Sequence, residues 1–270
     1  MSIDTAKGLR FFGNDLNNTA LGGTAAASSS NANAIFAFDG LATTKWLSTG
    51  EGTDGNQVTL EMDYSANKQI EAFYIYNTNI SDVEAQYWNG SAWVTADSSI
   101  ATITKSTDLR YIFIKLTSGV TTTKVRLAGT NTISANSEKS VSQFLTFTEL
   151  GQFEYFPKLK TKIEPSQNTF KTDSGKYFVI ERGEAFTAEL IFKSHVNQND
   201  ITLLTTLLER KDTFYIWPCG GDTTIFTYSF KPYRFKDIFK VAIVGVNTPE
   251  LTKNYYKAGL NTKLRLLEVV

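Results

Sequence analysis

The residues best suited to nucleophilic catalysis are the single histidine, His195, and the single cysteine, Cys219. A catalytic nucleophile needs a base beside it, and His195 could serve Cys219 or a serine in that role. No nucleophile-elbow motif surrounds either residue, and the Trp-Pro-Cys-Gly-Gly run at Cys219 favours a small apolar residue before a turn. His195, expected at the end of a strand, fits a surface or capping residue. The sequence therefore predicts that the protein is not an enzyme.

A glycine-rich stretch at residues 50–55 matches the letters Gly-x-Gly-x-x-Gly. A dinucleotide site needs a strand before this motif and a helix N-terminus after it to receive phosphate. Here a strand is expected to follow, and the carboxylates of Glu51 and Asp54 would repel phosphate. We therefore predict no dinucleotide site. No P-loop and no cysteine or histidine spacing typical of zinc occurs in the chain.

A second group of candidate residues lies in the Asp-Gly-x-x-x-Thr-x-Trp segment at residues 39–46, which follows an apolar approach. This segment combines a carboxylate, a turn, a hydroxyl and a large aromatic. Downstream, residues 87–93 contain an Asn-Gly pair between two tryptophans. Asn-Gly suits a two-residue hairpin turn because both central residues need positive φ, so Trp88 and Trp93 can pair across the strands. Both segments favour a β-sandwich.

Four segments in this order resemble the discoidin family, also called F5/8 type C domains, and the related galactose-binding-like carbohydrate-binding modules. They are residues 39–46, the strand at 58–64 with Asp63 in the acidic place, the Trp-Asn-Gly-Ser-Ala-Trp hairpin, and the closing stretch at 147–150. The resemblance spans roughly residues 25–156. It implies a jelly-roll β-sandwich.

The resemblance also implies a metal site. Many discoidin-like modules hold a structural calcium with oxygens of the Asp-Gly…Thr loop and an acid near the end of the domain. Carried over to this chain, the pattern nominates Asp39, Thr44 and Glu149 as calcium ligands. A hard ion with about six to eight oxygen ligands suits such a loop. The alternative is an Asp-Gly turn in which Thr44 forms local hydrogen bonds without a metal.

The family binds sugars through loops at one end of the sandwich, where aromatics stack on the ring and polar groups hold the hydroxyls. The resemblance nominates Trp88, Trp93 and Asn56 as ligand-binding residues, the last within the loop at 50–56. The alternative is that the two hairpin tryptophans support the turn. Trp46 is expected in the core.

The chain changes character near Pro157. Residues 1–156 carry 10 Lys and Arg against 15 Asp and Glu, so their net charge is 10 − 15 = −5. Residues 157–270 carry 17 against 12, so theirs is 17 − 12 = +5, and all five prolines lie in this part. The shift predicts an N-terminal arm at 1–24, a discoidin-like β-sandwich at 25–156 and a second β domain at 157–270.

The second domain combines a long hairpin at 176–195, turning at residues 182–184, with a helix at 199–211 and further strands. Leucines at every third or fourth position give the helix one apolar stripe. This order resembles phage tail-tube and distal tail proteins, which implies a small β-sandwich or split barrel with one flanking helix. Basic stretches at 158–162 and 231–236 fit strand alternation better than a nucleic-acid surface, so no specific nucleic-acid binding is expected.

The combination of both resemblances, without a catalytic set, predicts a mainly β structural protein of a tailed-phage or tail-like particle. It would be a distal tail or tail-tip subunit in a ring-shaped homo-oligomer beside other tail proteins, with the discoidin-like domain facing host-surface glycans. No signal peptide, membrane-spanning run or disulfide framework is evident, so we expect synthesis in the host bacterial cytoplasm and no membrane insertion. The alternative is a carbohydrate-binding module with an accessory domain of a glycan-processing system.

Overall fold

The computed structural model describes residues 9–13, 22–41, 43–105, 111–153, 158–171, 177–195, 197–210, 212–217, 238–246, 250–254 and 257–269. In these residues the fold is mainly β, with one α-helix and one 3-10 helix. The chain divides into two compact units. One is Asn14–Glu149, and the other combines Met1–Gly13 with Leu150–Val270.

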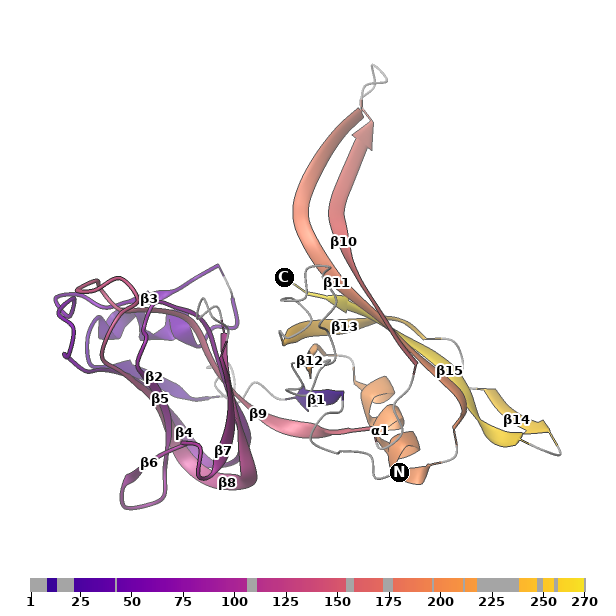
Figure 1. Ribbon diagram of the computed structural model, residues 1–270, viewed down its shortest axis with the longest axis horizontal. Helices are drawn as coiled ribbons and strands as arrows, with labels where there is room; N and C mark the ends of the chain where they lie inside the picture. Colours follow the sequence, from indigo (N-terminus) through magenta and orange to yellow (C-terminus); the bar gives the residue numbers. More distant parts are fainter. Residues whose placement is uncertain are drawn as a thin grey trace. The chain divides into compact units, whose positions relative to one another are not determined.

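The Asn14–Glu149 unit is a β-sandwich built on two long strands, β4 (Val58–Thr78) and β8 (Tyr111–Gly129) (Figure 1). The two strands pair antiparallel along their lengths, and their register shifts twice between Asp63 and Ala72. Register shifts of this kind bend a strand and increase its twist. Ser65, at this corner, has a φ of 58°. Each long strand therefore bends and contributes one half to each layer of the sandwich.

The first layer contains the first half of β4 and the second half of β8. On one side it is extended by β2 (Thr24–Ala27), which pairs with β4. On the other side β5 (Val83–Trp88) pairs with β8, and β6 (Trp93–Thr95) pairs with β5. Trp88 pairs with Trp93 as predicted, but the connection is residues 89–92 rather than a two-residue turn, and of Asn89 and Gly90 only Gly90 has a positive φ.

The second layer contains the second half of β4 and the first half of β8. On one side β7 (Ala101–Lys105) pairs with β8. On the other side β9 (Ser140–Gln152) pairs with β4, and the short β3 (Trp46–Leu47) pairs with β9. The 3-10 helix η3 (Asn31–Ala37) lies between β2 and β3 along the chain, so it connects the two layers.

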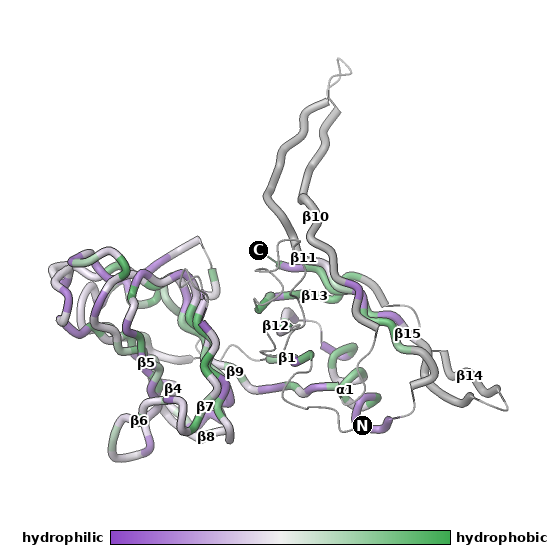
Figure 2. Tube along the Cα trace, viewed as in Figure 1, coloured by the Kyte–Doolittle hydropathy of each residue, from purple (hydrophilic) through white to green (hydrophobic). Residues whose placement is uncertain are grey.

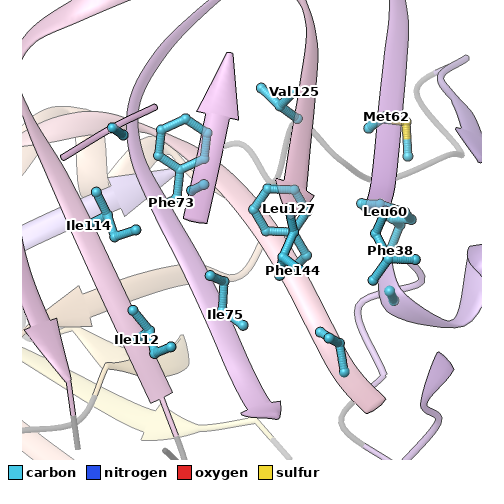
Figure 3. Close-up of a cluster of buried hydrophobic side chains, with 14 of the residues drawn as sticks. Phe38, Leu60, Met62, Phe73, Ile75, Ile112, Ile114, Val125, Leu127 and Phe144 are labelled. Carbon is cyan, nitrogen blue, oxygen red and sulfur yellow. The ribbon is translucent and has the colours of Figure 1, made fainter. Parts of the chain in front are cut away.

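The core of the sandwich consists of apolar side chains that alternate along the strands and meet between the layers. Trp46 is fully buried, as predicted, and its indole N–H donates to the carbonyl of Ser29 at 3.1 Å. The prediction of a mainly β chain with a jelly-roll sandwich on its N-terminal side is confirmed. Figure 3 labels core residues from both layers: Phe38, Leu60, Met62, Phe73, Ile75, Ile112, Ile114, Val125, Leu127 and Phe144.

The second unit contains seven described strands: β1 (Arg10–Gly13), β10 (Lys158–Lys171), β11 (Tyr177–His195), β12 (Phe214–Trp217), β13 (Phe239–Val246), β14 (Glu250–Asn254) and β15 (Lys257–Glu268). Six of them follow the spatial order β10-β11-β15-β13-β12-β1, and β14 pairs with β15.

Among the described residues of both units, no helix is long and apolar enough to cross a bilayer.

The predicted helix is present as α1 (Gln198–Glu209). Its N-cap is Asn197, whose side-chain oxygen accepts from the backbone N–H of Asp200 at 3.0 Å. Leu204 and Leu207 are buried in the core of this unit, whereas the threonines on the opposite side are exposed. The tube in Figure 2 shows this alternation of hydrophobic and hydrophilic residues along α1.

The structure divides the chain differently from the predicted parts. Arg10–Gly13 is strand β1, which pairs with β12, and Phe11 is buried in the core of the C-terminal unit. This part of the predicted arm at 1–24 is therefore a strand of the second unit. The division after the sandwich falls within β9, between Glu149 and Leu150. Pro157 and residues 1–8 and 14–21 lie outside the described residues.

The predicted hairpin at 176–195 is a single strand, β11, paired with β10 on one side and β15 on the other. Residues 182–184 are not a turn but lie at the register shift opposite Pro165 and Gln167. A glycine within a strand fits such a bulge as well as it fits a turn.

Candidate functional site

The Asp-Gly segment forms a closed turn. One carboxylate oxygen of Asp39 accepts from the Thr44 hydroxyl at 2.6 Å, and the other accepts from the backbone N–H of Leu41 at 2.8 Å. Gly40 has a φ of 75°, a conformation that glycine adopts without strain. The structure therefore brings together two of the three predicted calcium ligands, and the Thr44 hydroxyl bonds locally.

A buried amide closes this turn from β9. The side-chain nitrogen Nε2 of Gln143 lies 2.7 Å from the carbonyl oxygen of Leu41, 2.9 Å from Oδ1 of Asp39 and 3.5 Å from the carbonyl oxygen of Phe36. Its Oε1 accepts from the N–H of Gly40 at 3.0 Å. Gln143 was not among the predicted site residues. The sequence gives no clear signal for it, because Gln143 stands between Ser142 and Phe144 in a strand of mixed polar and apolar residues.

Glu149, the third predicted calcium ligand, lies elsewhere. It is about 20 Å further along β9 than Gln143. There it pairs with the ammonium group of Lys115 at 3.0 Å, and its backbone N–H donates to the carboxylate of Glu71. The three predicted ligands thus do not surround one point.

The geometry of the Asp-Gly turn does not fit a cation as the resemblance implies. Calcium needs about six to eight oxygens around it. The oxygens of Phe36, Asp39 and Leu41 that converge in this turn already face the amide nitrogen of Gln143. Within the described residues, no three His, Cys, Asp or Glu side chains cluster closely enough to hold a metal ion.

A second set of polar contacts, half-buried or exposed at Glu138, fixes the loop at 48–56. Glu138 accepts from the Ser48 hydroxyl and from the backbone N–H groups of Gly50, at 2.8 Å, and Glu51, at 3.3 Å. The Ser48 hydroxyl lowers the pKa of the Glu138 carboxyl below its usual value of 4.5, and the two N–H groups and Lys139 lower it further against the opposing effect of burial. The Glu138 carboxylate therefore holds this loop in place by accepting three hydrogen bonds from it.

Lys139 reaches the same loop from the interior. Its side chain is fully buried, and its ammonium group donates to the carbonyl of Glu51 and, at 3.0 Å, to that of Thr53. A buried ammonium group is tolerated only where acceptors surround it. The loop backbone thus supplies the acceptors that allow Lys139 to be buried.

Asp54 links this loop to the segment at 131–137. Its Oδ1 accepts from both the backbone N–H and the hydroxyl of Thr132, each at 3.1 Å, and its own N–H donates to Asn136 at 3.1 Å. Burial raises the pKa of Asp54, but the hydrogen bonds from Thr132 outweigh it, so the pKa lies below its usual 3.8. Asn56, one of the predicted sugar ligands, is exposed nearby and donates to Glu51 at 3.3 Å.

A pocket with a volume of about 270 Å³ opens at this loop end of the sandwich. It lies where β5 starts and β8 ends, and Gln57, the residue after Asn56, is part of its lining. Val83 and Ala128 supply apolar wall, and none of the described residues that line the pocket is aromatic. Its polar lining comes from Gln57, Asp82, Glu84, Lys105 and Thr130.

The two predicted sugar-binding tryptophans lie at the other end of the sandwich. Trp88 and Trp93 face each other across the hairpin with ring centroids 5.5 Å apart and an interplanar angle of 65°. The guanidinium carbon of Arg126 lies 4.4 Å from the centroid of the Trp93 ring. Because Trp88 is about 17 Å along β5 from Val83, one sugar unit cannot contact both the hairpin and Asn56.

Of the two residues considered for nucleophilic catalysis, the structure describes only the backbone of His195. His195 ends strand β11, where its backbone pairs with Leu260 of β15. Cys219 lies outside the described residues.

Comparison with known proteins gives matches among solved structures alone, since no family profile and no curated protein matches the chain. Chitosan-binding module 1 of a chitosanase/glucanase from Paenibacillus sp. IK-5 is 26% identical, and the match covers 48% of this chain and 98% of that chain with a TM-score of 0.39. Chitosan-binding module 2 of the same enzyme, solved with chitotriose, is 20% identical over 48% of this chain and 100% of that chain, with a TM-score of 0.39.

The family 32 carbohydrate-binding module of NanJ from Clostridium perfringens, solved with galactose, is 15% identical. That match covers 52% of this chain and 99% of that chain, with a TM-score of 0.41. These matches lie on the N-terminal half of the chain and give no support to the resemblance of the C-terminal part to tail proteins. The chain is thus similar, over about half its length, to carbohydrate-binding modules.

Proposed function

We propose that the Asn14–Glu149 unit is a non-catalytic carbohydrate-binding module and that the pocket at its loop end binds one sugar unit. The observation that carries the proposal is this pocket of about 270 Å³, lined by donors and acceptors together. Pockets for drug-sized ligands measure about 300–1,000 Å³. A cavity just below that range suits a single ring of a longer glycan.

The lining matches the chemistry of sugar hydroxyls, each of which both donates and accepts a hydrogen bond. Asp82 and Glu84 supply acceptors, and Lys105 supplies donors. Gln57 and Thr130 can do both. The apolar wall is small, and the part of the lining that the structure describes contains no aromatic ring. We therefore expect weak binding whose selectivity comes from hydrogen bonds.

In this proposal the C-terminal unit is an accessory domain of a glycan-processing system. The tail-tip role, with its ring-shaped oligomer, its tail-protein partners and its place in a virion, has no supporting observation in the described residues and stays a prediction. Sugar binding by Trp88 and Trp93 also stays a prediction; the two rings contact each other, and Arg126 lies over the Trp93 ring.

The test is a calorimetric or NMR titration of the full chain with galactose, N-acetylglucosamine and chitotriose. The pocket variant is Lys105→Ala, and the matched control is Lys45→Ala, because Lys45 is also exposed but does not line the pocket. Loss of one charged hydrogen bond of about 1.5 kcal/mol should raise Kd about tenfold in Lys105→Ala. The control should bind like the wild-type chain.

Two results would contradict the proposal. One is the absence of binding to all three probes at millimolar concentration. The other is binding that Lys105→Ala leaves unchanged and that a Glu84→Ala chain also retains in full.

A further inference from the structure

Gln143 is a buried side chain near the loop end and is 3% exposed. Its amide nitrogen has two hydrogens and faces three oxygens, those of Phe36, Asp39 and Leu41. Its amide oxygen accepts from Gly40. Both ends of the amide are therefore used, and all four partners lie within residues 36–41, at the end of η3 and in the Asp-Gly turn that follows it.

Convergence of carbonyl and carboxylate oxygens on one point is the arrangement by which proteins hold a hard cation. Here the point is occupied by the positive end of an amide dipole. The carboxylate of Asp39 accepts three hydrogen bonds, from the N–H of Leu41, the hydroxyl of Thr44 and the amide of Gln143. Each of these three partners is a hydrogen-bond donor of the protein itself.

We propose that Gln143 takes the place of a structural cation in this chain, so that the Asp-Gly turn is closed without calcium. Only a side chain that both donates and accepts can do this, because the turn presents an N–H group at Gly40 as well as the three oxygens. A carboxylate at position 143 could still accept from Gly40, but it could not donate to the oxygens. This inference does not depend on the sugar site.

The substitution Gln143→Glu converts the proposal into a measurable difference. The new carboxylate would stand against Asp39, with the carbonyl oxygens of Phe36 and Leu41 beside it. Two carboxylates and two carbonyls around one point, completed by water, form a set of oxygens that suits calcium. The variant should therefore need calcium, whereas the wild-type chain should not.

The experiment measures the melting temperature of the full chain with millimolar CaCl2 and with EDTA. The wild-type chain should melt at the same temperature in both. In EDTA, Gln143→Glu should melt about 5–10 °C lower than the wild type, because several buried hydrogen bonds are lost and two carboxylates are brought together. Calcium should restore much of this loss, and MgCl2 should restore less because Mg²⁺ demands a tighter octahedral site.

Two further variants separate this role from a general packing role. The double variant Gln143→Glu with Asp39→Asn removes the facing charge, so it should regain part of the melting temperature in EDTA and lose the response to calcium. Gln143→Ala should melt lower than the wild type with and without calcium. If Gln143→Glu does not fold in EDTA, its folding in calcium is the supporting result, and Gln143→Ala tests the amide independently.

A wild-type chain that calcium stabilises, with the effect abolished by Asp39→Asn, would overturn the proposal. So would a Gln143→Glu chain that melts at the same temperature in calcium and in EDTA. A Gln143→Ala chain as stable as the wild type would overturn it as well.

Discussion

At the loop end of the sandwich, Glu138, Lys139 and Gln143 fasten two loops to β9 by hydrogen bonds. At the hairpin end, Trp88 and Trp93 pack on each other beside Arg126. The loop-end contacts are made by buried or half-buried polar groups, and the hairpin contacts by half-exposed aromatics. The polar pocket opens at the end whose loops are fixed. The two tryptophans predicted to stack on a sugar contact each other across the hairpin at the opposite end.

This difference predicts a ranking of stability effects. A buried polar group whose partner is removed retains its full cost of desolvation, whereas a half-exposed contact is replaced by water. Substitutions at the loop end should therefore cost more than substitutions at the hairpin end.

Trp46 should give the largest effect. It is fully buried at the loop end and joins β3 to the Ser29 loop. Trp46→Ala should lower the free energy of unfolding by about 3–5 kcal/mol, because it removes a large core side chain and leaves a cavity. Denaturant unfolding measures the loss. Trp46→Phe, which keeps a ring but loses the N–H donor, is the matched control and should cost less.

Lys139 should follow. In Lys139→Met the aliphatic stem is preserved, but the carbonyls of Glu51 and Thr53 lose their ammonium donor. The expected loss in the free energy of unfolding is about 1.5–3 kcal/mol, the range for hydrogen bonds to a charged group. The same change at the exposed Lys45 should cost less than about 0.5 kcal/mol. Equal effects at the two lysines would contradict the ranking of buried over exposed contacts.

Trp93 tests the hairpin end. Trp93→Ala removes the edge-to-face contact with Trp88 and the stacking of Arg126, so it should cost about 1 kcal/mol. It should leave the binding of the sugar probes unchanged, as a titration alongside Lys105→Ala can show. Loss of sugar binding in Trp93→Ala with the fold intact would move the sugar site to the hairpin.

Several local features of this comparison could be predicted from the sequence. The Asn-Gly pair indicated the hairpin, and the segment at 39–46 indicated the turn in which Asp39 and Thr44 meet. These features depend on neighbours within a few residues, where turn chemistry is informative. The apolar stripe of α1 was likewise visible because it repeats along one helix.

The long-range contacts could not be predicted in the same way. Gln143 lies 104 positions from Asp39, and the ammonium group of Lys139 bonds a carbonyl 88 positions away. Both contacts exist because the register of β9 against β4 and β3 places these residues beside the loops. The alternation of polar and apolar residues along a strand does not determine which strands become neighbours. For this reason the pairing of β1 with β12 could not be predicted from the sequence either.

The smallest of these effects concerns pH at the loop end. The pKa of Glu138 is lowered in the folded chain, chiefly by the Ser48 hydroxyl, from a usual value of 4.5. The folded state therefore binds fewer protons than the unfolded state around that pH. The stabilisation is present above the unfolded value of about 4.5 and is lost as the pH falls through the lower folded value.

The free energy of unfolding should thus decrease between about pH 5 and pH 3, and Glu138→Gln should flatten this decrease because it has no proton to gain. Ser48→Ala, which removes the leading cause of the lowered pKa, should flatten it in part. Denaturant unfolding at a series of pH values measures the slopes. An undiminished slope in Glu138→Gln would assign the acid sensitivity to other carboxylates, such as Asp54, whose pKa is also lowered at this end.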